Sequence, residues 1–106
     1  VALPDGLVLV DGSLQREFVD LNDGKLAGQD LSHASLASVN LARAELAGAD
    51  LRNADLKGAV LASANLRGAN LTGADLQDAV LAGADLTKAI FDEANLDGAD
   101  LSGARC

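Results

Sequence analysis

The fold of this chain is decided by a stretch that reads ANLRGANLTGADLQDAVLAGADL from Ala64 to Leu86. A leucine stands at every fifth position of this stretch, and an alanine stands two residues before each leucine. The residue between them is usually Asp or Asn, so the repeating unit is Ala-Asp/Asn-Leu-x-x. The unit continues in both directions: a large apolar residue occupies all seventeen fifth positions from Leu21 to Leu101, and only Phe91 is not Leu.

A period of five residues fits neither an α-helix nor a flat strand. In a helix each leucine would be turned by about 140° from the one before, because each residue advances by about 100°. In a strand alternate leucines would point to opposite faces. The chain must therefore turn a corner once per repeat. This predicts a solenoid of short extended segments, with Leu and Ala inside, whose coils stack on one another to bury their apolar side.

The number of repeats in one coil is indicated by departures from the consensus. These departures recur twenty residues apart: Val60 recurs as Val80, and Gly28 recurs as Gly48. This spacing favours four repeats per coil and a square cross-section. Residues 19–106 would then form a square solenoid of about four and a half coils, a little over 20 Å long at about 4.8 Å per coil.

The composition excludes several other classes of protein. The 106 residues carry a formal charge of −8, and a hydrophobic fraction of 49% is too high for a disordered acidic tail. No apolar run approaches the roughly 18 to 20 residues that span a membrane, and one Cys cannot form an internal disulfide. The acidic balance argues against direct nucleic acid binding, which would require a basic patch.

The tandem units resemble those of pentapeptide repeat proteins, over about 85 residues from Val19 to Cys106. The resemblance implies an all-β fold, a right-handed quadrilateral β-helix with one repeat on each side. It also implies which residues fill the interior: the large apolar residues from Leu21 to Leu101, and the small residues two positions before them.

Residues 1–18 lack the repeat, and we expect them to form a short N-terminal cap over the open edge of the first coil. The apolar run Leu7–Val10 lies between two turn signals and predicts a short strand. Ser13 is a candidate N-cap for a helical turn that runs to Phe18. The chain therefore divides into a cap segment and a repeat segment, residues 19–106.

Both ends of the sequence leave alternatives open. The chain stops at Cys106, in phase with the leucines, so we expect an uncapped end that a longer natural chain, a partner or a second copy would cover. The first residue is Val1 and not Met, which removal of a targeting segment or simple trimming would explain. The family includes plastid lumen proteins and is abundant in cyanobacteria. A processed, thylakoid lumen-like location therefore stands beside bacterial cytoplasm as a hypothesis.

Candidate catalytic and metal-binding residues are few. His33 faces outward with no second ligand at a suitable spacing, which indicates an ordinary surface residue. Cys106 and Phe91 occupy inward positions and are interpreted as apolar core residues. Four aspartates would stack in pairs on adjacent coils: Asp30 on Asp50, and Asp55 on Asp75. Such pairs could hold a cation or act as acid and base, but hydrogen bonds to corner amides are the favoured role. We predict no catalytic residue, no metal site and no cofactor.

An apolar patch on the outside of the solenoid points to a protein contact. Valine or isoleucine replaces Asp or Asn at three outward positions, and four repeats per coil would stack two of these on one face and put Ile90 on the opposite face. The alternative is that β-branched residues simply suit a sheet-like face. The candidate contact surface consists of Val60, Val80, Ala62, Ala82 and Ile90.

Three functions compete at this point. The first is a non-enzymatic rigid scaffold or protein-interaction module, such as a subunit of a photosynthetic or other assembly, which contacts a partner or itself through the Val60/Val80 face or the C-terminal end. The second follows from the resemblance: some pentapeptide repeat proteins mimic DNA in shape and charge, bind type II topoisomerases such as gyrase, and confer quinolone resistance. The third is an enzyme or cation-binding protein that uses the stacked aspartates.

Overall fold

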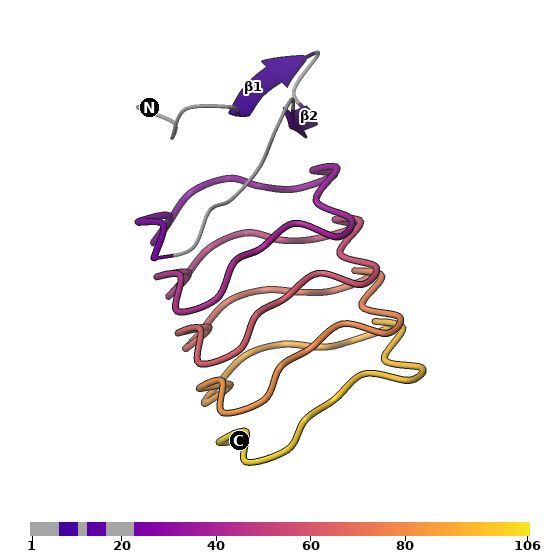
Figure 1. Cartoon of the computed structure of the whole chain (residues 1–106). Coiled ribbons are helices and arrows are strands. Elements are labelled where there is room, and N and C mark those ends of the chain that lie inside the picture. Colours follow the sequence, from indigo (N-terminus) through magenta and orange to yellow (C-terminus); the bar gives the residue numbers. More distant parts are fainter. Residues whose placement is uncertain (1–6, 11–12, 17–22) are drawn as a thin grey trace.

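The structure is a computed structural model of the whole chain, and it describes residues 7–10, 13–16 and 23–106. Two strands, β1 (Leu7–Val10) and β2 (Ser13–Arg16), pair antiparallel as a hairpin near the amino terminus. Residues 23–106 form a stack of four-sided coils, as Figure 1 shows. None of the described segments is a helix that could cross a membrane.

The expected strand at the position of β1 is confirmed, but the expected helical turn from Ser13 is wrong, because Ser13–Arg16 pairs with β1 as a strand. In the sequence only Asp11-Gly12 separates the two strands, and a two-residue Asp-Gly connection is a strong hairpin signal. A single helical turn is costly to nucleate, so strand pairing prevails over the N-cap signal. The continuation to Phe18 lies outside the described residues, and the capping role of residues 1–18 stays a prediction.

Each corner of a coil is a type II β-turn. The C=O of the inward Leu31 accepts a hydrogen bond from the N–H of Ala34 at 3.1 Å, which closes one such turn. The third turn residue, here His33, has a φ of 62°, and its counterparts in all seventeen corners from Asp23 to Gly103 have φ between 59° and 71°. Glycine enters this region without steric cost and stands at eight of these corners. The type II turn in each repeat therefore produces the change of chain direction that a five-residue repeat requires.

Successive coils are joined by parallel β-bridges, and each of the thirteen described bridges spans twenty residues. Val60 pairs with Val80 in this way: the N–H of Val60 donates to the C=O of Val39 at 3.0 Å, and the N–H of Leu61 donates to the C=O of Val80 at 2.6 Å. One residue on each side of the square makes the bridge. Four repeats per coil, predicted from the recurrences in the sequence, are therefore confirmed.

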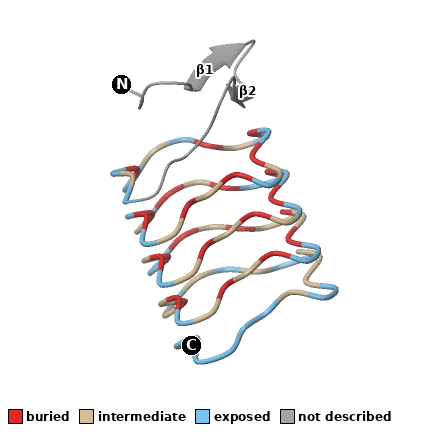
Figure 2. Ribbon diagram, viewed as in Figure 1, coloured by how far each residue is buried: buried red, intermediate tan, exposed pale blue. Residues whose placement is uncertain are grey.

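The inward leucines and alanines fill the narrow interior of the solenoid. The eleven leucines from Leu26 to Leu76 are at most 1% exposed, and all the buried residues of the described part are apolar. Exposure increases towards the last coil, as Figure 2 shows, and Leu101 is 42% exposed. Phe91 packs against the core as predicted. The interpretation of Cys106 as a core residue is wrong, because its side chain is exposed.

Candidate protein-contact face

We name the four sides of the solenoid faces A to D, in chain order around one coil. Each face carries one column of bridge residues, whose successive members lie twenty residues apart. Face A is opposite face C, and face B is opposite face D. The columns are Lys25, Glu45, Asn65, Asp85 and Arg105 on face A; Asp30, Asp50, Asn70 and Ile90 on face B; Ser35, Asp55, Asp75 and Asn95 on face C; and Asn40, Val60, Val80 and Asp100 on face D.

Most bridge residues are Asp or Asn because the corner that follows needs a hydrogen-bond acceptor. The backbone N–H of the second turn residue bonds neither to the turn nor to a neighbouring coil, and a side-chain Oδ1 two residues earlier accepts it. Asn70 Oδ1, for example, accepts from the N–H of Thr72 at 3.1 Å and from its hydroxyl at 2.6 Å. Ten described corners share the backbone bond, and the residues that accept it are Asp30, Asn40, Asp50, Asp55, Asn65, Asn70, Asp75, Asp85, Asn95 and Asp100.

These corner bonds also lower the pKa of several aspartates. The hydroxyl of Ser32, and then its amide, lower the pKa of Asp30. The pKa of Asp50 is lowered chiefly by the hydrogen-bonded guanidinium of Arg52, whose Nη2 lies 2.7 Å from Oδ2. Hydroxyl and amide donors act in the same order on two further aspartates, from Thr87 on Asp85 and from Ser102 on Asp100. The ionised form of these aspartates therefore stabilises the fold.

The two predicted stacks of aspartates exist, since Asp30 pairs with Asp50, and Asp55 pairs with Asp75. The Oδ1 atom of each accepts the amide of its own corner. His33 is exposed, as predicted. Within residues 7–10, 13–16 and 23–106, no group of three or more His, Cys, Asp or Glu forms a metal-binding arrangement, and the described surface has no pocket.

The two central corners of face D lack this acceptor, as do the corners that follow Lys25, Ser35, Glu45 and Ile90 on the other faces. Of the described faces, face D alone has valine at two such corners. Val60 and Val80 stand where an Asp or Asn would accept the N–H of Ala62 and of Ala82, and no described group bonds to either N–H. The two alanines lie in one column beside the valines, since the N–H of Ser63 donates to the C=O of Ala82 at 2.8 Å. All four side chains are half-buried. The structure thus brings together four of the five residues of the predicted contact surface.

The fifth residue, Ile90, lies on face B, opposite the valines, as four repeats per coil predicted. It pairs with Asn70 in the column of bridge residues, and its side chain is 42% exposed. Asp30 and Asp50 occupy the first two positions of the same column. Ile90 is therefore an isolated apolar residue on an acidic face and does not extend the patch on face D.

Charged side chains are unevenly distributed over the four faces. Each face is counted from its inward small residue to the end of the corner that follows, so that the described part of face D consists of residues 23, 39–43, 59–63, 79–83 and 99–103. Faces B and C each carry four acidic side chains and one basic side chain, and face A carries four basic and two acidic ones. Among its described residues face D carries Asp23, Arg43 and Asp100, which gives a net charge of −1.

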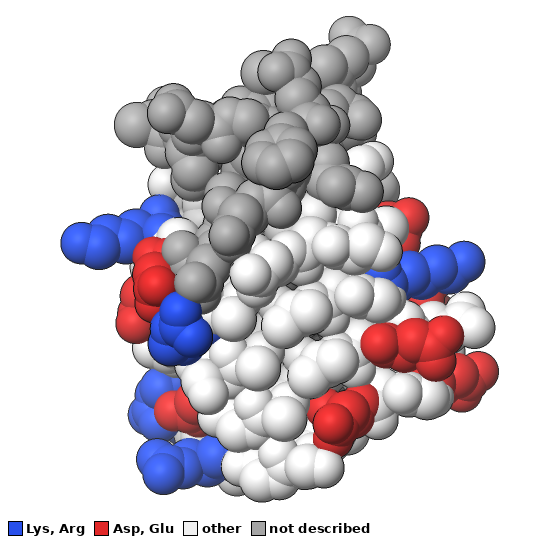
Figure 3. Space-filling model, in the orientation of Figure 1, with Lys and Arg blue, Asp and Glu red and all other residues white. Residues whose placement is uncertain are grey.

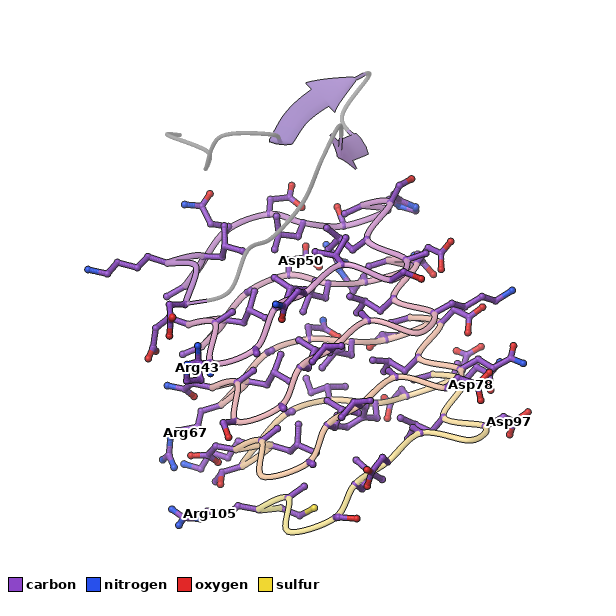
Figure 4. All side chains as sticks on the ribbon, viewed as in Figure 1. Arg43, Asp50, Arg67, Asp78, Asp97 and Arg105 are labelled. Atoms are coloured by element: carbon purple, nitrogen blue, oxygen red, sulfur yellow. The ribbon has the colours of Figure 1, made fainter. Side chains whose placement is uncertain are left out.

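Figures 3 and 4 show face D towards the viewer. The chain crosses this face from the corner that contains Asp78 to the corner that contains Arg43, and these two residues stand at opposite edges of Figure 4. In the part of Figure 3 that is not grey, the surface between the two edges is mostly uncharged, with an acidic side chain near its lower end. Reasoning from the sequence found the valines but missed the small number of charges on face D and the excess of cations on face A. Sorting the charged residues by their position in a twenty-residue period would have shown both.

Comparison with known proteins agrees with this architecture. The sequence model of the family described as pentapeptide repeats matches eight copies, over residues 18–53, 40–78 and 69–105. A comparison with curated proteins gave no significant match.

Several solved structures are similar to the chain, among them two pentapeptide repeat proteins. The pentapeptide repeat protein Rfr23 from the cyanobacterium Cyanothece 51142 is 40% identical over 76% of this chain, with a TM-score of 0.74. A pentapeptide repeat protein from the Arabidopsis thaliana thylakoid lumen is 43% identical over 74%, with a TM-score of 0.73. The chain spans 56% and 55% of the length of these two proteins. With this similarity and a repeat match along most of its length, the chain belongs to the pentapeptide repeat family, and its solenoid is a right-handed quadrilateral β-helix.

Proposed function

We propose that this protein is a non-enzymatic, rigid protein-interaction module that contacts its partner through face D. The observation that carries the proposal is the replacement of Asp or Asn by valine at two stacked corners, Val60 and Val80. Pentapeptide repeat proteins are generally structural or interaction modules, and this general role supports the proposal.

The two valines stand at positions where the fold itself favours another residue. An intramolecular hydrogen bond contributes about 0.5 to 1.5 kcal/mol to stability, and the corners of Ala62 and Ala82 each lack one that ten other corners have. Departures from a local structural rule are expected at functional positions. The departure occurs twice on the face that has the fewest charged side chains among the described residues, which supports a contact role for face D. A contact role for Ile90 stays a separate prediction.

A capture experiment with matched variants tests this proposal. The chain is immobilised as wild type, as Val60→Asp/Val80→Asp, and as Ile90→Asp, and each is exposed to an extract of the cells that produce it. We expect a protein, identified by mass spectrometry, that the wild type and Ile90→Asp retain and that Val60→Asp/Val80→Asp loses. Equal retention by all three would overturn the role of face D.

The distribution of charge supports this function over mimicry of DNA. The surface of DNA is negative all along its length because each strand carries regularly spaced phosphates. Here two of the four described faces carry a net charge of −3, face D carries −1 and face A carries +2. Binding to a type II topoisomerase stays a prediction, and unchanged gyrase supercoiling activity at high concentrations of this protein would eliminate it.

We also propose a cellular compartment for this protein. The Arabidopsis relative is from the thylakoid lumen, and the other relative is from a cyanobacterium. These sources support a thylakoid lumen-like location, with bacterial cytoplasm as the alternative. Immunodetection in fractionated cells of the source organism would distinguish the two.

A further inference from the structure

We infer that the partner of face D presents carboxamide oxygens, from Asn or Gln side chains, to the free backbone N–H groups of Ala62 and Ala82. Apolar groups around these oxygens pack on Val60 and Val80 in this arrangement. The inference rests on the proposed contact role of face D and deepens it, because it names the chemistry that the face recognises.

The two free N–H groups lie in the middle of a column of four corner amides on face D. In the first corner of the column, Asn40 Oδ1 accepts the N–H of Ala42 at 3.0 Å, and the last corner is satisfied in the same way. In the two central corners, the N–H groups of Ala62 and Ala82 have no acceptor among the described residues. These alanines lie on adjacent coils, about 4.8 Å apart. Face D therefore presents two neighbouring hydrogen-bond donors.

A partner that packs on the valines also removes water from these donors. Asn40 reaches the N–H two residues later from the position that Val60 occupies one coil further along, so the side chain of Val60 borders the N–H of Ala62. The same holds for Val80 and Ala82, and both valines and both alanines are already half-buried. A buried N–H without an acceptor is costly, and nearly all buried backbone N–H groups in native proteins are paired. A partner of face D therefore needs two acceptors as well as apolar groups.

Spacing and charge select the kind of acceptor. Main-chain carbonyls on one side of an extended strand recur every two residues, about 6.6 Å apart, and this spacing exceeds the distance of about 4.8 Å between coils. A pair of carboxylates would approach a chain whose formal charge is −8 and a face that already carries Asp100. A carboxamide oxygen has no charge, and Asn40 supplies the same group to Ala42 within the fold. We therefore assign the two acceptors to Asn or Gln.

Free corner amides on the other described faces lie in a different setting. A second stacked pair lies on face A, at Ala27 and Ala47, but the bridge residues beside it are Lys25 and Glu45. Both of these charged side chains are exposed, and a partner that covered them would have to remove their water as well. On faces B and C the free corner amides of the described residues occur singly. Face D thus combines two stacked donors with apolar neighbours.

A library of random peptides displayed on phage tests this inference, because it reads the chemistry of the face without the natural partner. The peptides are selected on the folded full chain, and each enriched peptide is then measured against matched variants. Ala62→Pro/Ala82→Pro removes both donors and keeps the corners, since Pro is common at the second residue of a type II turn. Ala37→Pro is the control, because it removes a free N–H from the same kind of corner on face C. Circular dichroism checks that each variant is folded.

We expect enriched peptides that combine Asn or Gln with apolar residues. They should bind Ala37→Pro as tightly as the wild type and bind Ala62→Pro/Ala82→Pro at least about tenfold more weakly, because two hydrogen bonds are lost. A second measurement needs no variant and uses NMR of the wild type. Bound peptide should slow amide hydrogen exchange at Ala62 and Ala82 and leave the exchange at Ala37 unchanged.

Enriched peptides that carry Asp or Glu in place of Asn or Gln would overturn the inference, and so would a selection that yields no peptide dependent on Val60 and Val80. Equal binding to Ala62→Pro/Ala82→Pro and the wild type, or unchanged exchange at the two amides in the complex, would also overturn it. None of these results decides the proposed function, which requires only that face D binds a protein and which the capture experiment tests separately. A captured protein that Val60→Asp/Val80→Asp loses and Ala62→Pro/Ala82→Pro retains would support the function and exclude the acceptors.

Discussion

The side-chain oxygen of Asn53 occupies the space in which a Cβ on Gly73, one coil further along the chain, would lie. Gly73 also has a φ of +71°, so both its backbone conformation and its surroundings favour glycine. Gly68, with a φ of +67°, has nothing within 4 Å of its own Cβ position. The two corners thus share their backbone conformation and differ in the space that the neighbouring coil leaves.

This difference predicts unequal costs for the same substitution. Gly68→Ala should lower the free energy of unfolding by about 1 kcal/mol, the cost of a left-handed non-glycine residue. Gly73→Ala should lower it by about 0.5 kcal/mol more, because the exposed amide group of Asn53 must turn to a less favourable rotamer. Urea unfolding measures both values. In the background Asn53→Gly the additional cost of Gly73→Ala should disappear, and equal costs for Gly68→Ala and Gly73→Ala in the native background would contradict the contact.

Val60→Asn should stabilise the folded monomer. The new Oδ1 can accept the N–H of Ala62 as Asn40 accepts that of Ala42 at 3.0 Å, and such a bond contributes about 0.5 to 1.5 kcal/mol. The half-buried valine offsets part of this gain, so we expect a net increase of about 0.5 kcal/mol in the free energy of unfolding, measured in urea at a low protein concentration.

Val39→Asn provides the contrast, because Val39 is fully buried at an inward position. The substitution Val39→Asn should lower the free energy of unfolding by about 3 kcal/mol or more, since it buries a side-chain amide without hydrogen-bond partners. If Val60→Asn instead lowered stability by more than about 1 kcal/mol, the valine would be needed by the fold, and the argument for a contact role would fail.

Stability should fall in acid. The folded pKa values of Asp30, Asp50, Asp85 and Asp100 are lowered from the ordinary value of 3.8, so each group contributes stability that is fully present above that value. The contribution is lost as the pH falls through the folded pKa values. We expect the urea midpoint to be level between about pH 7 and pH 5 and to fall below pH 4.

Replacing these four aspartates together by asparagine tests the cause of the pH dependence. Asparagine keeps the Oδ1 acceptor but does not titrate in this range. The quadruple variant should therefore show a smaller decrease in urea midpoint between pH 5 and pH 3 than the wild type does. An unchanged pH dependence would assign acid sensitivity to other carboxylates.

The interior should respond to truncation according to coil position. Leu56→Ala, at a fully buried site, should cost about 2 to 5 kcal/mol because it removes buried methyl groups and leaves a cavity. Leu101→Ala, at a site that is 42% exposed, should lower the free energy of unfolding by less than about 1.5 kcal/mol. Thermal unfolding of the two variants compares them, and similar losses would contradict the gradient of burial along the solenoid.

The sequence predicts most of the solenoid because its periodicity is a local property. A leucine at every fifth position fixes which residues point inward, and the recurrence of Val60 as Val80 indicates four repeats per coil. The resemblance to a known family adds the handedness. The strand that begins at Ser13 was not predicted, because one short polar segment can either cap a helical turn or form the second strand of a hairpin. Pairing with Leu7–Val10 decided between these two structures.

The sequence by itself therefore determined the fold, the inward residues and the stacking of Val60 on Val80. The tertiary structure alone decided which amides lack an acceptor, that Cys106 is exposed, and that Asn53 limits the residue at position 73. The physical reason is that a period of five specifies the direction of each side chain, whereas hydrogen bonds and steric contacts depend on atoms twenty residues away. Only the stacked coils bring those atoms together.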